Sequence, residues 1–446
     1  MKSSKSDFTT GPILKPLIIF SAPIMLANLL QTSFQIVDSL WVGNILDAEA
    51  LGAVAIATTI LVTILSFILG LNNAALTILS QQHGRKDDEG LKRYLNAFIV
   101  IMTSMSAVFA VIGYIFAESL LGIIGTPDAI LDMAASYLQI SLLGMFFLFG
   151  YNFINTVFRA LGDSKTPLRI VFIAVILNAI LAPVFMIVLN LGIQGAAMAT
   201  VGSQAIAFLY SVYLAVKRKL VPFKMPTMPA RYEVGLILKL GIPAGLQMGV
   251  IHAGIAAILS VVTQFGADSV AGFSAAQRLD SLIMLPAMAL GTAVNAMAGQ
   301  NIGIQQWPRV KQIARNAALY NFGLMMSVAA VVIIFAEAGI RMFIQDEAAV
   351  EFGTNYLRIV ALCYPFLGLN FVLNGIVRAS GAMYQVLILN IISFWILRYP
   401  LSALFASYFG EIGVGMGMGI SFIISSVFAS LYYKFGKWRE KELFKK

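Results

Sequence analysis

Runs of about twenty apolar residues, uninterrupted by charge, recur along nearly the whole chain and limit what it can fold into. Each run has the length that a helix needs to cross the roughly 30 Å hydrocarbon core of a bilayer. Because the runs are continuous rather than alternating in polarity, they predict helices and not the strands of a membrane barrel. The 446 residues are 59% hydrophobic and 11% charged, well beyond the roughly 45–50% apolar content of soluble domains. We expect an all-α integral membrane protein.

Polar breaks divide the chain into twelve expected transmembrane helices. Their approximate ranges are 14–40, 50–79, 94–117, 130–157, 167–189, 193–216, 234–262, 270–298, 312–336, 350–377, 384–408 and 413–433. The start of the chain, "MKSSKSDFTTG", is polar, and the first apolar run is too long for the core of a cleaved signal peptide. The first helix is therefore expected to stay in the protein.

Lysine and arginine mark one side of the membrane. The N-terminus, alternate loops and the C-terminus contain 26 of the 30 basic residues. By the positive-inside rule, both termini are expected in the cytoplasm of a multi-pass protein of the cell membrane. The net charge of +9 thus follows from topology, and its spread along the chain argues against a nucleic-acid partner.

The two halves of the chain resemble each other at an offset of about 219 residues. "YLQI" at 137 corresponds to "YLRI" at 356, and "FRALG" at 158 corresponds to "VRASG" at 377. This duplication predicts two six-helix bundles related by a pseudo-two-fold axis along the membrane normal, with a cavity between them, as in transporters. The expected domains are an N-terminal lobe (1–216), a cytoplasmic linker (217–233) and a C-terminal lobe (234–446) with a short basic tail.

A polar stripe interrupts the first apolar run. Asn28, Gln31, Gln35 and Asp38 are spaced so that, at 100° per residue, they fall within roughly an 80° wedge of a helix. In a membrane such a stripe is expected to face protein or water, so it predicts a lining of the N-terminal lobe. Asp38 alone would equally fit the outer end of a span. Together with the stripe, it predicts a poorly solvated carboxylate that takes up and releases protons.

Pro23 lies fifteen residues before Asp38 in the same predicted helix and leaves the carbonyl of Ile19 without its usual donor. We interpret Pro23 as a hinge whose bending moves Asp38. Proline is also common in membrane helices without any such role, and Pro243 occupies the matching place in the second half.

Other polar side chains lie within the expected spans. Single Asn, Gln and Thr residues there are most often hydrogen-bonding contacts between helices, worth about 0.6 kcal/mol each. His252 titrates near neutral pH in water, although a lone histidine more often bonds to a neighbour. Arg278 and Asp280 are two residues apart and face different sides of a helix, so we expect structural ion pairs with residues elsewhere. A part in ion coupling is the alternative for these three residues.

Enzymatic and metal-binding motifs are missing from the sequence. No G-x-x-x-x-G-K-[ST] signature occurs, so ATP is not expected as the energy source. His83 and His252 are far apart, and Cys363 is the single cysteine, which leaves no set of metal ligands and no disulfide. We expect a secondary transporter without metal or cofactor, and not an enzyme.

Five segments, in this order and partly duplicated, carry a resemblance to a known family. They are "APIMLANLLQTSFQIVDSLWVG", "LSQQHGRKD", "FRALGDSKTP", "GIQGAAMAT" and "AAQRLDSLIMLPAMALGTAVNAMAGQNIG". The chain resembles the multidrug and toxic compound extrusion (MATE) transporters over nearly its whole length, and within them the DinF-like branch. The resemblance implies two six-helix bundles that export cationic amphiphiles in exchange for protons or sodium.

The resemblance also implies roles for particular residues. Asp38 matches the family's cation site and Pro23 its kink, while polar positions of the same cavity match Tyr137, Asn155, Asn178 and Thr200, with Gln31 as a neighbour. One departure is Ala182, where many relatives have an acid four residues after the asparagine. Because hard cations such as sodium need several oxygen ligands, the loss of this acid favours proton coupling over sodium coupling.

The expected function is therefore efflux of organic cations and amphiphilic drugs by exchange for protons, a form of xenobiotic export. Substrate contacts are expected from Gln31, Gln35, Asn155, Phe34, Phe153, Met25 and Met186, although Met and Phe at helical spacing more often pack. The expected partners are drug-like small molecules and the lipid bilayer, and the expected state is a monomer.

A flippase for a lipid-linked precursor is the alternative transporter. An anionic pyrophosphate lipid would need several cationic side chains, and only Arg278, Arg358 and Arg398 lie near membrane depth. A membrane-embedded prenyl-group transferase would need paired acidic motifs, which the sequence lacks.

Overall fold

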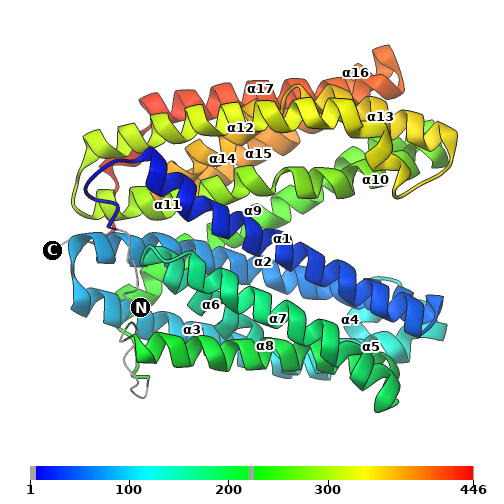
Figure 1. The fold of residues 1–446 in the computed structure, drawn as a ribbon, viewed down its shortest axis with the longest axis horizontal. Helices are drawn as coiled ribbons and strands as arrows, with labels where there is room; N and C mark the ends of the chain where they lie inside the picture. The colour runs from blue at the N-terminus through cyan, green and yellow to red at the C-terminus, as the bar shows by residue number, and fades with distance from the viewer. Residues whose placement is uncertain (1–6, 219, 221–225, 445–446) are drawn as a thin grey trace. The chain divides into compact units, whose positions relative to one another are not determined.

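The computed structural model describes residues 7–218, 220 and 226–444, and these residues form helices and no strand (Figure 1). Within them, ten helices are long and apolar enough to span a membrane, and two bent helix pairs raise the number of spans to twelve. The expected all-α membrane fold is confirmed, and every expected span overlaps a helix or a bent pair.

The first half of the chain contains eight α-helices and a π-helical segment. They are α1 (Leu14–Ile45), α2 (Ala48–Arg85), α3 (Asp88–Ile115), α4 (Ala117–Ile123), α5 (Asp128–Leu143), α6 (Met145–Ala160), α7 (Lys165–Pro183), η1 (Val184–Val188) and α8 (Gly192–Lys217). The second half follows the same order. Its elements are α9 (Arg231–Val262), η2 (Thr263–Phe265), α10 (Ala267–Ile283), α11 (Leu285–Gly303), α12 (Trp307–Arg341), α13 (Glu347–Ala361), α14 (Tyr364–Ala379), α15 (Met383–Ile391), η3 (Ile392–Arg398), α16 (Tyr399–Phe409), α17 (Glu411–Phe435) and η4 (Lys437–Glu440).

The chain divides into two compact units whose boundaries fall inside helices. Unit 1 contains residues 26–241, and unit 2 contains residues 7–25 and 242–444 of those described. The first boundary lies in α1 two residues after Pro23, and the second lies in α9 directly before Ile242 and Pro243. The expected lobes, 1–216 and 234–446, differ from these units by two half-helices. The expected linker lies partly outside the described residues, and α9 already begins within it.

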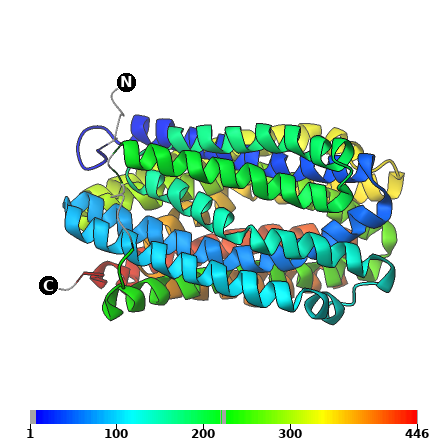
Figure 2. The same cartoon turned by 90° about the horizontal axis from the view of Figure 1, so that it is seen from below.

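In unit 1, small residues let the helices approach closely. Helices α2, α3, α6, α7 and α8 run side by side, and α8 contacts α5, α6 and α7 (Figures 1 and 2). A β-carbon on Gly144 or Gly150 would collide with Val201 or Phe208 of α8. Gly144 also separates α5 from α6, which meet at 49°, so the span expected over 130–157 is one bent pair. Glycine thus serves both the bend and the contact with α8.

Unit 2 repeats this construction. Helices α13 and α14 meet at 56° and replace the straight span expected over 350–377. Glycines bring backbones together at both ends of this pair, Gly272 of α10 against the carbonyl of Ala349 and Gly375 of α14 against the carbonyl of Gly291. Such contacts between small residues are typical of helix packing in membranes.

The N-terminal segment belongs to unit 2. Phe8 is only 1% exposed, and its ring packs edge-on against Phe20 with centroids 4.9 Å apart. The Arg309 guanidinium donates to three backbone carbonyls of this segment, those of Phe8 (2.9 Å), Thr10 (2.7 Å) and Gly11 (2.9 Å). These bonds fix the chain just before α1 begins.

Candidate functional site

Asp38 lies on α1, seven residues before the helix ends, and is buried with 8% of its surface exposed. The hydroxyl of Thr200 on α8 donates to Asp38 Oδ1 at 3.4 Å. The amide of Asn178 on α7 donates in turn to the Thr200 hydroxyl at 3.1 Å. Three helices therefore contribute one side chain each to a hydrogen-bonded chain that ends on a buried carboxylate.

Local backbone features bring these three side chains together. Asn178 precedes Pro183, at which α7 changes into the π-helical segment η1. Gly195 of α8 lies against this segment, because a β-carbon there would stand 2.8 Å from the Phe185 carbonyl carbon and oxygen. The close approach holds α8, and with it Thr200, next to α7. Single-turn π-helical segments inside membrane helices are frequent at functional sites.

One oxygen atom of the site has no partner. Asn178 Oδ1 is buried and accepts no hydrogen bond from the residues that the structure describes. Asp38 belongs to none of the four ion pairs found among these residues. Buried polar atoms normally have partners, so a carboxylate and an unpaired carbonyl oxygen in one site indicate a place for a proton or a cation.

The surroundings of this site are apolar. Tyr137, Ala182 and Met186 are all buried in the hydrophobic core of unit 1, together with Val42, one turn beyond Asp38. Position 182 contributes only a methyl group, and no group of three metal-ligating side chains occurs in the described chain. An isolated carboxylate in such surroundings is costly to keep ionised.

The remaining residues of the polar stripe are more accessible than Asp38. Gln31 and Gln35 are exposed, whereas Asn28 and Phe34 are half-buried. Met25 is half-buried and is the last residue of α1 that groups with unit 2.

Two of the expected substrate contacts lie in the core of unit 1. Phe153 is 4% exposed and packs against Phe98 of α3, with ring centroids 5.6 Å apart. Asn155 is equally buried, and its Oδ1 has no partner among the described residues. Within the described residues, neither side chain forms a hydrogen bond with Asp38, Asn178 or Thr200, so the structure does not join them to the carboxylate site.

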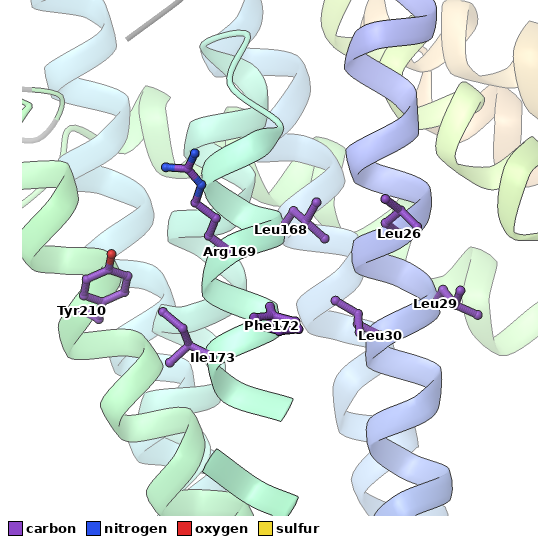
Figure 3. A pocket seen from close by; sticks show the side chains of 8 residues that line it. All are labelled: Leu26, Leu29, Leu30, Leu168, Arg169, Phe172, Ile173 and Tyr210. Atoms are coloured by element: carbon purple, nitrogen blue, oxygen red, sulfur yellow. The ribbon is translucent and has the colours of Figure 1, made fainter. Parts of the chain in front are cut away.

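A cavity of about 580 Å³ lies beside α1, between α1, α7 and α8 (Figure 3). Its lining is apolar apart from Arg169 and Tyr210, and α1 contributes Leu26, Leu29 and Leu30. The last α1 residue that lines this cavity, Leu30, is eight residues before Asp38, roughly 12 Å along the helix axis. The cavity is therefore separate from the carboxylate site.

The secondary candidates all lie in unit 2. His252 is exposed on α9, and Arg278 is exposed on α10 with its guanidinium 5.8 Å from the Phe343 ring. Asp280 accepts a hydrogen bond from the hydroxyl of Tyr364 on α14. The ion pairs expected for Arg278 and Asp280 do not form within the described residues, because an aromatic ring and a tyrosine hydroxyl take the place of charged partners.

Sequence reasoning missed most of the environment of Asp280. The Gln277 amide donates to the Tyr356 hydroxyl (3.1 Å), which in turn contacts Met418 Sδ (2.9 Å). Arg398 is 5% exposed and sits between the rings of Phe394 and Phe422, 3.8 and 4.6 Å from their centroids. The only available signal was the presence of ionisable residues within apolar runs.

Two compact units that repeat the same order of membrane helices, each with an ionisable side chain buried among them, have the construction of a membrane transporter. The family model MatE matches the chain twice, at residues 23–184 and 243–404, which are 220 residues apart. The chain therefore belongs to the MATE family of transporters. The expected family and the expectation that the protein is not an enzyme are confirmed, whereas membership of the DinF-like branch stays a prediction.

Relatives and solved structures agree with this assignment. The chain is 56% identical over 438 residues to the probable multidrug resistance protein YpnP of Bacillus subtilis, covering 98% of each chain. It is 22% identical to the multidrug export protein MepA of Staphylococcus aureus, covering 91% and 90%. A Vibrio cholerae MATE transporter, VcmN, superposes with a TM-score of 0.91 at 22% identity, covering 97% of this chain and 98% of that one.

Proposed function

We propose that this protein exports organic cations across the cell membrane in exchange for protons, and that Asp38 binds the exchanged proton. The observation that supports this most directly is the buried Asp38 carboxylate, held by Thr200 and, through it, by Asn178, with no cationic partner in the described chain. Relatives of this protein are named as multidrug resistance and export proteins, which supports drug-like substrates.

The chemistry follows from the cost of a buried charge. An ionised Asp38 in an apolar core is costly. The cost is relieved either by a proton, which neutralises the carboxylate, or by a cationic substrate, which pairs with its charge, and the two compete. Protonation from the outside removes the attraction for the substrate and weakens the hydrogen bond from Thr200, because bonds to ionised groups are stronger than bonds to neutral ones. Proton binding therefore favours substrate release.

Pro23 is proposed as the hinge of this step. The boundary between the two compact units lies in α1 two residues after Pro23, and a proline removes the backbone bond that would stiffen the helix there. Bending at this place would move Asp38 relative to the N-terminal end of α1, which is fixed through Arg309.

Sodium is the second candidate for the coupling ion. The unpaired Asn178 Oδ1, the Asp38 carboxylate and the Thr200 hydroxyl together offer oxygen ligands to a hard cation. Ala182 supplies no oxygen ligand, so the proton remains the preferred ion.

Both termini are proposed to be cytoplasmic because the basic residues gather on that side.

The proposal is tested by efflux of a fluorescent cationic dye from proteoliposomes. An imposed pH gradient should drive efflux by the unaltered protein, and Asp38→Asn should reduce the rate to that of protein-free liposomes. Asp132→Asn, an exposed acid on α5, is the matched control and should retain the rate of the unaltered protein. Efflux driven by a sodium gradient alone would identify sodium, and not the proton, as the coupling ion. An active Asp38→Asn variant would refute the role of Asp38.

A further inference from the structure

Unit 2 contains a buried polar cluster that the proposed function does not use. Asp280 is at its centre and remains partly accessible, whereas Tyr356, Tyr364 and Arg398 around it are 2%, 0% and 5% exposed. The four residues come from α10, α13, α14 and η3 and all belong to unit 2. Buried hydroxyl groups and a guanidinium around a carboxylate can stabilise its charge when it gives up a proton.

Three ionisable groups lie close to Asp280, one each from α13, α14 and η3. Tyr364 of α14 donates to its carboxylate, and Tyr356 of α13 and Arg398 of η3 lie within electrostatic reach. The other charged side chains of the elements packed against α10 are engaged elsewhere or exposed. Arg278 stacks on Phe343, Arg341 pairs with Glu337 and Glu347, Arg358 bonds to the Ile333 carbonyl, and Asp268 and Glu351 are exposed.

Arg398 gives the cluster a permanent positive charge without a direct ion pair. Its guanidinium lies between two aromatic rings and its Nε donates to Ser421 at 3.4 Å, and no carboxylate of the described chain lies within 4.0 Å of it. A cation at this place lowers the cost of ionising Asp280, yet leaves the carboxylate free to accept a proton. A contact ion pair would instead hold Asp280 in the ionised state.

The cluster occupies the same place in unit 2 as the Asp38 site does in unit 1. Tyr356 is the repeat counterpart of Tyr137, and the alignment of Gly195 with Gly413 makes Met418 the counterpart of Thr200. The Tyr356 hydroxyl contacts Met418, so the counterparts of two residues near Asp38 contact each other in unit 2. The acid itself comes from a different helix of the repeat, α10 instead of the counterpart of α1.

We propose that Asp280 is a second proton-binding residue, which takes up and releases one proton in each transport cycle. The inference rests on the proposed exchange of a cation for protons at Asp38 and adds a second, separate proton to it. One proton exchanged for one monovalent cation moves no net charge, whereas two protons move one charge per cycle. The membrane potential would then contribute to export, by about tenfold in the final substrate gradient for every ~60 mV.

The test uses proteoliposomes with the full-length protein, an internal monovalent cationic dye and equal pH on both sides. A potassium diffusion potential, negative inside, should accelerate efflux by the unaltered protein. Asp280→Asn should abolish this dependence on the potential while efflux driven by a pH gradient persists. Asp268→Asn, an exposed acid in the first turn of the same helix, is the control and should respond like the unaltered protein.

The outcomes separate the two proposals. An absence of pH-driven efflux by the unaltered protein would refute proton exchange as such. If pH-driven efflux is present but does not respond to the potential, or if Asp280→Asn still responds, the second proton is refuted and the first is unaffected.

Tyr364→Phe provides a second variant that keeps the carboxylate. It removes the hydroxyl that donates to Asp280 and should move the pH dependence of potential-driven efflux to higher pH, since an ionised Asp280 loses a donor. The matched control is Tyr320→Phe, a tyrosine of α12 with no recorded bond to the cluster. An unchanged pH dependence in Tyr364→Phe would contradict the proposal even if Asp280→Asn fails to fold.

Discussion

At the scale of single residues, the Thr200 hydroxyl is the group through which α8 acts on Asp38. Its bond to the carboxylate is 3.4 Å long, at the far end of the hydrogen-bonding range. The Asn178 amide orients the Thr200 hydroxyl by donating a hydrogen bond to it. A hydroxyl that is a donor to Asp38 and an acceptor from Asn178 fixes the direction of both bonds. The stabilisation of the ionised Asp38 carboxylate therefore depends on hydrogen bonds between three short side chains and not on a pair of opposite charges.

Thr200→Val removes this hydroxyl and keeps the shape of the side chain. The ionised form of Asp38 loses a donor, so the carboxylate should hold its proton to higher pH and the pH dependence of dye efflux should move upward. A hydrogen bond to a charged group contributes about 1.5 kcal/mol at the weak end of its range, which corresponds to roughly one pH unit. The pH profile of efflux in proteoliposomes measures this shift.

Thr156→Val is the control for this prediction. The Thr156 hydroxyl is also buried in unit 1, but it donates only to the Asn152 carbonyl within its own helix (3.0 Å). Its removal should leave the pH profile unchanged. Equal shifts in both variants would mean that the change reflects unit 1 as a whole and not the bond to Asp38.

Particular site residues differ in how far the sequence could predict them. Asp38 stands out because a carboxylate within an apolar run is expensive. Asn178 and Thr200 look like ordinary contacts between helices, and only the family resemblance pointed to them. Tyr364 could not be found, because its contact with Asp280 joins residues 84 positions apart and nothing local in the sequence marks it.

At the scale of helices, the close approach of α8 to the π-helical segment η1 positions the site. Gly195 faces the backbone of Phe185 and Met186, which cannot move aside as a side chain could. In unit 2 the counterpart glycine, Gly413 of α17, also faces a backbone, although here that of α16 and not of the π-helical segment, since a β-carbon would collide with the carbonyl of Phe405. The duplicated glycine thus has the same physical reason in both halves.

Gly195→Ala should destabilise the protein by about 1–3 kcal/mol, the usual cost of an overpacked contact. Gly202→Ala on the same helix is the control, because its β-carbon would meet only Leu181 Cδ1 at an ordinary 3.9 Å. This control should be neutral or slightly stabilising, since alanine favours helix. Thermal unfolding in detergent distinguishes the two, and equal melting temperatures would show that η1 yields to the added carbon.

The sequence predicted which segments form spans but not how they bend. Apolar runs report length and burial, so all twelve spans were found. The bend at Gly144 was missed because membrane helices contain many glycines, and only tertiary contacts decide which of them breaks a helix. The bend between Ala361 and Tyr364 was missed because it contains no glycine, and Pro365 after it is of a type that membrane helices often tolerate. The π-helical segments η1 and η3 lie beside Pro183 and Pro400, where proline withdraws a backbone donor, yet Pro23 and Pro243 lie in continuous helices.

At the scale of the whole molecule, the two compact units do not coincide with the two halves of the duplicated sequence. Residues 7–25 belong with the second half, where Arg309 and Asn301 bind the backbone of Phe8. Residues 231–241 of α9 belong with the first half, and Gly241 lies close to Leu71. Each half of the sequence is therefore incomplete as a folding unit.

Separate expression of residues 1–217 and 231–446 tests this division. Neither fragment alone should give a monodisperse, thermally stable protein in detergent, whereas co-expression of both should restore folding and dye efflux. The control is the full-length chain with a protease site inserted within 219–225 and cut after purification, which should remain active. A fragment that folds and melts cooperatively by itself would contradict the division.

The same division limits the positions at which this chain and a relative can be joined into a functional hybrid. A hybrid joined between α8 and α9 would combine each compact unit with a half-helix taken from the other parent, so its packing partners would never have been selected together. Hybrids joined beside Met25 and Gly241 would instead transfer complete units. Recombination between MATE genes is thus expected to succeed at positions inside two membrane helices, and not at the loop where the duplication visibly ends.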